Sequence, residues 1–329
     1  MTFEQPVIST GIGSWPGTDI VEAIKITFDE CPDLPYLPEL PARGAPAGLI
    51  GRSSGILAEL TVDLQPSGWR LIDGYGIDHR RAVGLFRDDL DQLEEQAQGY
   101  AGWFKIGFAG PWTLAASIER QRGGLVLSDT GARRDLGQSL AEGLAELSSE
   151  LNRRLPDLRL IIQLDEPLLP AVHRGSVPTA SGYGRYRAID DPELSETLTQ
   201  LVRRLEPHPV VLHCCAAGAP IPLLAGTGIT GIGLDLDQLR TADWDGIGAA
   251  IEQGIWFGAG AAPTDRVIGP DAVAERVLRP VRDLGLDPES SRLVITPACG
   301  LAGSTPTDAV RILHSVRRAA EIVAEELPR

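Results

Sequence analysis

Residues 159–165 read Arg-Leu-Ile-Ile-Gln-Leu-Asp, a short apolar run that ends on a carboxylate. Similar runs, rich in Ile, Val and Leu, recur along the chain on both sides of it. Runs of this kind are typical of strands that are buried on both faces of a parallel sheet. We predict eight such strands, at residues 7–13, 55–62, 104–110, 159–165, 209–215, 231–236, 254–260 and 292–297.

Helical patterns lie between these runs. Leucines at 136, 140, 144, 147, 151 and 155 have helical spacing, and residues 191–206, 270–284 and 305–327 show similar periodicity. Strands alternating with helices predict an α/β fold, a (β/α)8 TIM barrel formed as a single domain by residues 1–329. An open doubly wound sheet is disfavoured, because residues 11–16 lack the third glycine of a dinucleotide turn. The Pro-rich residues 31–48 are expected to form a long ordered loop.

Composition narrows the class of protein. The 329 residues carry a net charge of −15, which argues against nucleic acid as a partner, because phosphate binding needs clustered Lys and Arg. No apolar run is long enough for a membrane span, and no signal-peptide pattern is present. Four cysteines, two of them adjacent, do not suggest a disulfide framework. We therefore expect a cytoplasmic protein.

The polar residues that follow the predicted strands suggest a metal site. In a (β/α)8 barrel the C-terminal ends of the strands converge on one rim, where active sites form. His213 and Cys215 lie at alternate positions of one strand and so share a face. Cys299 follows another strand. Two sulfurs and an imidazole suit zinc, and they are the predicted catalytic and ligand residues. The alternative is that these cysteines belong to the core.

Carboxylates also occupy strand ends. Asp235 is the preferred fourth ligand, although Asp237 shares its face and either side chain could instead cap a helix. Asp165, in the buried Asp165-Glu166 pair, needs a partner, which could be a substrate ammonium group or a barrel cation. Ser14, beside backbone N–H groups, could hold a substrate carboxylate or simply form a turn. Glu59 is a weaker candidate for the same pocket.

Five short motifs, in this order, resemble the C-terminal catalytic domain of cobalamin-independent methionine synthase. The resemblance runs from residue 8 to about residue 305. The motifs are Ile12-Gly13-Ser14-Trp15-Pro16, Gly110-Pro111-Trp112-Thr113, Gln163-Leu164-Asp165-Glu166-Pro167, His213-Cys214-Cys215 and Thr296-Pro297-Ala298-Cys299-Gly300-Leu301.

The resemblance implies a barrel of the uroporphyrinogen decarboxylase and methionine synthase superfamily with a Zn²⁺ cofactor. It assigns zinc to His213, Cys215, Cys299 and Asp235 (or Asp237). It also implies that homocysteine is held by a second set of residues, namely Ile12, Gly13, Ser14 and Asp165, with Glu59 as an unanchored addition.

The sequence departs from the family on the side of the methyl donor. The family's additional N-terminal barrel is not matched, so a partner protein could replace it. The histidine that the family carries in its seventh-strand loop is missing from residues 258–265, and Ala115-Ala116-Ser117 stands where a tryptophan is expected. The acidic ligand is Asp rather than the usual Glu.

These observations predict a methyltransferase that acts on the thiol of homocysteine to form methionine. A free thiol is mostly protonated at neutral pH, and zinc favours its thiolate form. The predicted donor is a methyltetrahydrofolate. Alternatives are a corrinoid or protein-borne donor on the same fold, or a non-catalytic barrel that binds zinc or thiols. A decarboxylase of the porphyrinogen type is disfavoured, because it would need basic residues and no metal.

Overall fold

Seven parallel strands of the described residues form one sheet in the computed structural model, which describes residues 3, 5, 7–74, 76–284 and 292–327. Six neighbouring pairs are hydrogen-bonded in parallel register. Across the sheet the strands are β1 (Val7–Ser9), β10 (Leu293–Pro297), β9 (Trp256–Ala262), β8 (Gly231–Asp235), β7 (Val210–Cys214), β6 (Arg159–Asp165) and β4 (Trp103–Ala109). The predicted α/β barrel class is confirmed, and seven of the eight predicted strands overlap a strand of this sheet.

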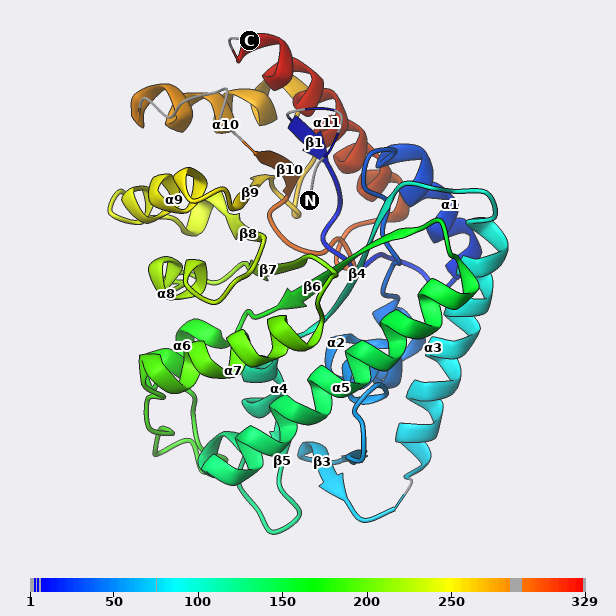
Figure 1. Ribbon diagram of the computed structural model, residues 1–329, viewed down its shortest axis with the longest axis vertical. Coiled ribbons are helices and arrows are strands. Elements are labelled where there is room, and N and C mark those ends of the chain that lie inside the picture. The colour runs from blue at the N-terminus through cyan, green and yellow to red at the C-terminus, as the bar shows by residue number, and fades with distance from the viewer. Residues whose placement is uncertain (1–2, 4, 6, 75, 285–291, 328–329) are drawn as a thin grey trace.

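Helices connect and surround these strands (Figure 1). The longer ones are α1 (Ile20–Glu30), α3 (Ile77–Gln96), α5 (Thr130–Arg154), α7 (Asp191–Arg204), α9 (Asp243–Glu252), α10 (Pro270–Leu284) and α11 (Pro306–Glu326). Shorter ones are α2 (Leu49–Ser54), α4 (Pro111–Ala115), α6 (Leu169–His173) and α8 (Ile221–Ala225), with 3-10 turns η1 (Pro41–Arg43), η2 (Ala45–Ala47), η3 (Val126–Ser128) and η4 (Leu236–Gln238). None of the described helices is both long and apolar enough to cross a membrane.

Side-chain caps explain where several of the long helices begin. Asp129 accepts a hydrogen bond from the Ala132 amide at the start of α5, and Thr305 accepts one from the Asp308 amide at the start of α11. The helix predicted from residue 191 begins there, and Asp190 caps it by accepting a hydrogen bond from the Glu193 amide.

The barrel strand predicted at residues 55–62 is wrong, since only residues 61 and 62 are in a strand, and that strand belongs to another sheet. Residues 55–60 form turns beneath α5, where Leu57 is buried and Ala58 exchanges hydrogen bonds with Ser139. The chain then enters a separate three-stranded sheet. That sheet is built from β2 (Thr61–Gln65), β3 (Gly68–Ile72) and β5 (Ile118–Glu119), and Figure 1 shows β3 and β5 at the end of the molecule away from α10 and α11.

Residues 35–39, within the Pro-rich loop, lie between β4 and the segment that follows β1. The Leu37 amide donates to Lys105 of β4, and the Glu39 amide donates to Gly13 beyond β1. Pro35 and Pro38 have no N–H, so this segment makes single bridges rather than a regular ladder. Seven regular strands and one irregular segment therefore surround the interior, in place of eight regular strands.

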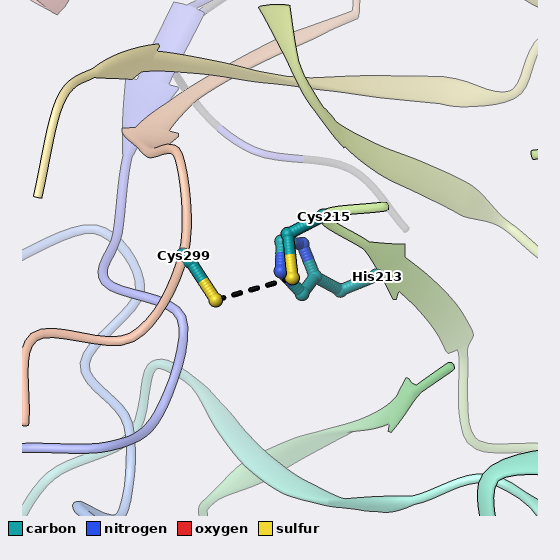
Figure 2. Close-up of side chains that lie close together, drawn as sticks. All are labelled: His213, Cys215 and Cys299. Atoms are coloured by element: carbon teal, nitrogen blue, oxygen red, sulfur yellow. Dashed lines mark hydrogen bonds between the residues drawn. The ribbon is translucent and has the colours of Figure 1, made fainter. Parts of the chain in front are cut away.

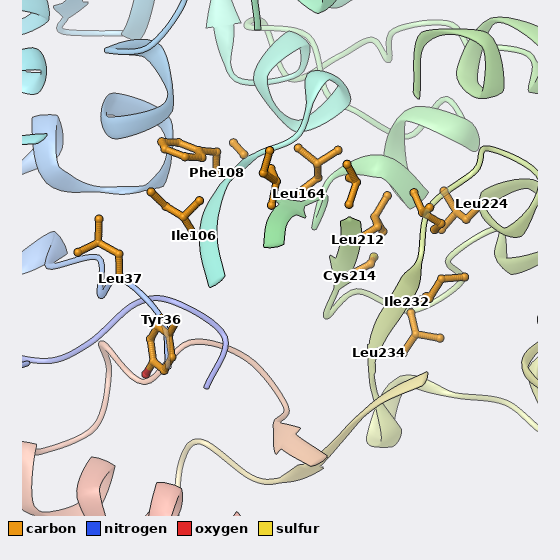
Figure 3. Close-up of a cluster of buried hydrophobic side chains, with 14 of the residues drawn as sticks. Tyr36, Leu37, Ile106, Phe108, Leu164, Leu212, Cys214, Leu224, Ile232 and Leu234 are labelled. Carbon is orange, nitrogen blue, oxygen red and sulfur yellow. The ribbon is translucent and has the colours of Figure 1, made fainter. Parts of the chain in front are cut away.

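The core follows the alternation of the strands. Figure 3 shows part of it, with side chains of β4, β6, β7 and β8 packed together. Cys214 is buried in this apolar cluster. Its neighbours His213 and Cys215 point away from it, because successive residues of a strand face opposite sides. Cys214 is therefore a packing residue of the core, whereas His213 and Cys215 are available for the site.

Candidate metal centre

Three predicted ligands converge. His213 and Cys215 come from the C-terminal end of β7, and Cys299 comes from the turn after β10. The ligand atoms of these side chains all lie within 4.8 Å of one another. Figure 2 shows the side chain of Cys299 pointing across to the two residues from β7, with the two sulfurs 3.2 Å apart.

The unsatisfied hydrogen-bonding capacity of His213 supports a metal ligand role. The side chain is only 4% exposed, and neither ring nitrogen has a hydrogen-bond partner among the described residues. A buried polar atom without a partner is costly. One imidazole and two thiols are a donor set that zinc takes in catalytic sites. The three residues therefore fit a zinc ion.

The two thiols affect each other's acidity. The hydrogen bond with Cys215 lowers the pKa of Cys299 below its usual value, and nearby His213 lowers it further. The same contact raises the pKa of Cys215. The pair therefore stabilises one thiolate, which is the form that binds metal.

Asp235 lies at the end of β8, next to this group but not part of it. Its side chain caps the 3-10 turn η4 by accepting a hydrogen bond from the Asp237 amide at 2.9 Å. Asp237, the alternative ligand, instead accepts a hydrogen bond from Arg276 with its carboxylate. The predicted fourth ligand thus occupies a capping position, and ligation by Asp235 stays a prediction.

A cavity of about 310 Å³ adjoins the three ligands. It contains four residues of the predicted homocysteine site. Its lining is Ile12, Gly13, Ser14, Leu37, Glu39, Pro41, Leu49, Arg52, Gly107, Asp165, Pro167, His213, Cys215, Cys299 and Gly300. Glu59 does not line it, because this residue is exposed in the turn before β2 with a φ of 59°. The placement of Glu59 therefore does not support a role in the cavity.

Close backbone contacts hold Ser14 beside Cys299. The Leu301 amide donates to the Ser14 carbonyl, and the Trp15 amide donates to the Glu39 carbonyl, each at 2.8 Å. A Cβ at position 300 would lie 2.0 Å from Ser14 Oγ, so a side chain there would force Ser14 to shift. The Cys-Gly-Leu motif thus packs against the Ile-Gly-Ser motif.

Asp165 is held by a buried polar network. Gln163 Nε2 donates to Asp165 Oδ1 at 2.8 Å and to the Ile12 carbonyl at 2.9 Å. Lys105 Nζ donates to Gln163 Oε1 and to the carbonyls of Gly11 and Ile12. Burial raises the pKa of Asp165 to about 6, while His213 and Lys105 oppose the shift. The nearby His213 and Lys105 favour the ionised form of Asp165, whose side chain lines the cavity.

Glu166 serves a different purpose from Asp165. Its fully buried carboxylate accepts hydrogen bonds from the Trp112 and Thr113 amides and from the Thr113 hydroxyl at the start of α4. A Cβ at Gly110 would lie 2.3 Å from that carboxylate. The Gly-Pro-Trp-Thr and Asp-Glu-Pro motifs are thereby explained as one helix-capping unit.

Sequence reasoning missed Glu39 and Arg52. Glu39 is 8% exposed, and burial raises its pKa to about 7 despite the opposing charge of Arg52. Arg52, in α2, is 3% exposed. Both residues lie outside the predicted strand ends. The only signal for Glu39 was its position within the Pro-rich loop, and Arg52 had none.

The fold and site belong to the class of α/β barrels with a candidate metal centre at the C-terminal ends of the strands. The structure is similar to a B12-independent methionine synthase from Shewanella sp. W3-18-1, solved in complex with selenomethionine. The TM-score is 0.62 over 99% of each chain, at 14% identity. At this identity the similarity shows the fold alone.

Another similar structure is β-methylaspartase from Clostridium tetanomorphum, with a TM-score of 0.45 and 14% identity over 96% of this chain and 59% of that one. This weaker likeness carries no functional inference. No protein-family model matches the sequence, and neither does any curated protein.

Proposed function

We propose that this protein is a zinc-dependent S-methyltransferase that transfers a methyl group to the thiol of homocysteine to form methionine. The single observation that supports this most is the convergence of His213, Cys215 and Cys299 at the edge of the cavity. This cavity also contains Ser14 and Asp165, which the sequence resemblance assigns to homocysteine.

Different residues of the chain would bind the metal and the substrate. His213, Cys215 and Cys299 would hold the zinc ion, with Asp235 as the proposed fourth ligand. A bound zinc ion would favour the thiolate form of the substrate sulfur. Asp165, anchored by Gln163, would receive the substrate ammonium group. Fixing the amino-acid end in this way brings the sulfur toward the three ligands and lowers the entropic cost of reaction.

Metal content and thiol binding test this proposal together. We expect one zinc ion per wild-type chain by elemental analysis, and a substantial loss of zinc in Cys299→Ser, because one of three ligands is removed. Homocysteine should bind to the zinc-loaded wild type by calorimetry and much more weakly to Cys299→Ser. Cys214→Ser is the matched control, since Cys214 packs in the core, and its zinc content should match the wild type.

The methyl donor is tested by methionine formation. We propose a methyltetrahydrofolate, and the assay includes methylcobalamin and a methylsulfonium compound as competing donors, with and without cell extract to supply a partner protein. Methionine from one donor alone identifies it. Zinc binding without homocysteine affinity would contradict the methyltransferase and favour a non-catalytic zinc-binding barrel.

A further inference from the structure

Arg52 is a buried cation among the residues that line the cavity. Its Nη1 donates to the Pro38 carbonyl at 2.9 Å. Its Nε and Nη2 have no hydrogen-bond partner among the described residues. An arginine stays charged at any physiological pH and carries five N–H donors. Two of its three nitrogens are therefore left without acceptors in a buried position.

The surroundings of Arg52 hold it in place but do not neutralise it. Its guanidinium carbon lies 5.2 Å from the centre of the Phe86 ring and 5.4 Å from that of Phe108. These aromatic rings give a cation–π attraction and fix the side chain. The carboxylates of Glu39, Asp89 and Asp165 are close enough to act on its charge, but Asp89 pairs with Arg43, and none of the three forms an ion pair with Arg52 among the described residues. A buried charge in this state is costly unless an anion completes its environment.

We propose that Arg52 joins the Ser14 segment, the predicted carboxylate site in the same cavity, in binding the carboxylate of the substrate thiol, so that the cavity selects thiols that carry a carboxylate. This inference rests on the proposed function and names a residue that the sequence motifs do not include. A guanidinium can bind a carboxylate through two parallel hydrogen bonds. With Asp165 available for the ammonium group, the cavity presents one cation and one anion to the two ends of an amino acid.

A cycle that changes both ligand and protein tests this pairing. Zinc-loaded wild type, Arg52→Met and Arg52→Lys are titrated by calorimetry with homocysteine and with 3-aminopropane-1-thiol, which lacks the carboxylate. The wild type should bind homocysteine about 10-fold to 100-fold more tightly than the aminothiol, as expected of charge-assisted hydrogen bonds. Arg52→Met should lose this preference without weakening the aminothiol, and Arg52→Lys should keep part of it.

A second ligand separates recognition from folding. 4-Sulfanylbutanoate keeps the carboxylate but lacks the ammonium group, so Arg52→Met should weaken its binding by the same factor as homocysteine. Equal weakening of all three ligands would mean that Arg52 is only structural, and the inference would be wrong. If Arg52→Met does not fold, the loss of preference is measured in Arg52→Lys instead, and the comparison of ligands on the wild type can still contradict the inference. Equal affinities there contradict the inference but leave the methyl-transfer proposal intact, whereas no thiol binding at all overturns both.

Discussion

Glu39 is buried next to Arg52 without a direct ion pair, and this placement affects stability as well as binding. Burial raises the pKa of its carboxyl to about 7. In the unfolded chain a glutamate releases its proton near pH 4.3. Between these two values the folded state binds more protons than the unfolded state, so Glu39 stabilises the fold at low pH and loses this contribution as the pH rises.

We therefore expect the free energy of unfolding of the metal-free protein to contain a term that falls as the pH rises from about 4.5 to 7. One pKa unit corresponds to about 1.4 kcal/mol, so the term should amount to a few kcal/mol at most. Urea denaturation across this range measures it, and Glu39→Gln should flatten the decline because an amide does not titrate.

Glu142→Gln is the control for this measurement. Glu142 is exposed, and its hydrogen bond with Arg204 lowers its carboxyl pKa, so its own contribution is lost only below the measured range. This variant should keep the wild-type slope. A slope that is the same in Glu39→Gln and the wild type would show that Glu39 is not held protonated by the fold.

The contrast between Glu39 and Glu59 shows how far the site was predictable. His213, Cys215 and Cys299 were found because they follow strands whose apolar runs are plain in the sequence. Glu59 was chosen because it lay in a predicted barrel strand, but it lies in a turn before β2 instead. Glu39 was missed because residues 35–39 reach the barrel through single hydrogen bonds, and no periodic pattern marks such a segment.

At the scale of elements, the packing of α5 explains the mistaken strand. The apolar residues at 55–62 pack against a helix, and short apolar runs do not by themselves distinguish this from a buried strand. Gly143 of α5 lies against the turn, since a Cβ added there would lie 1.7 Å from the Ile56 carbonyl oxygen. This close approach was not predictable, because it depends on how the helix docks.

Gly143→Ala should consequently destabilise the protein, by about 1–3 kcal/mol or more, since overpacking forces backbone shifts. Urea denaturation measures this change. Gly84→Ala in α3 is the matched control: a Cβ there meets no described atom within 4 Å, and alanine should stabilise the helix by roughly 0.5–1 kcal/mol. Equal effects of the two substitutions would mean that α5 does not lie this close to residue 56.

At the scale of the whole molecule, the regular sheet ends at β1 on one side and at β4 on the other. Unpaired strand edges of this kind attract other chains unless they are covered. Residues 35–39 bridge the two sides, because the Leu37 amide bonds to Lys105 of β4 and the Glu39 amide bonds to Gly13, in the segment that follows β1. The same segment places Glu39 in the wall of the cavity. The residues that close the barrel therefore also form part of the site.

Amide hydrogen exchange tests this closure. The amides of Leu37 and Glu39 should exchange slowly, at rates like those of β4, because opening them requires the barrel to open. The amide of Tyr183, in a loop where the side chain is 99% exposed, gives the fast reference. If Leu37 and Glu39 exchanged as fast as Tyr183, the edges of β1 and β4 would be open in solution, and Glu39 would have no fixed place beside Arg52. Slow exchange at both amides would instead mean that a segment without regular secondary structure is as firmly held as the strands, which is what a site on this rim requires.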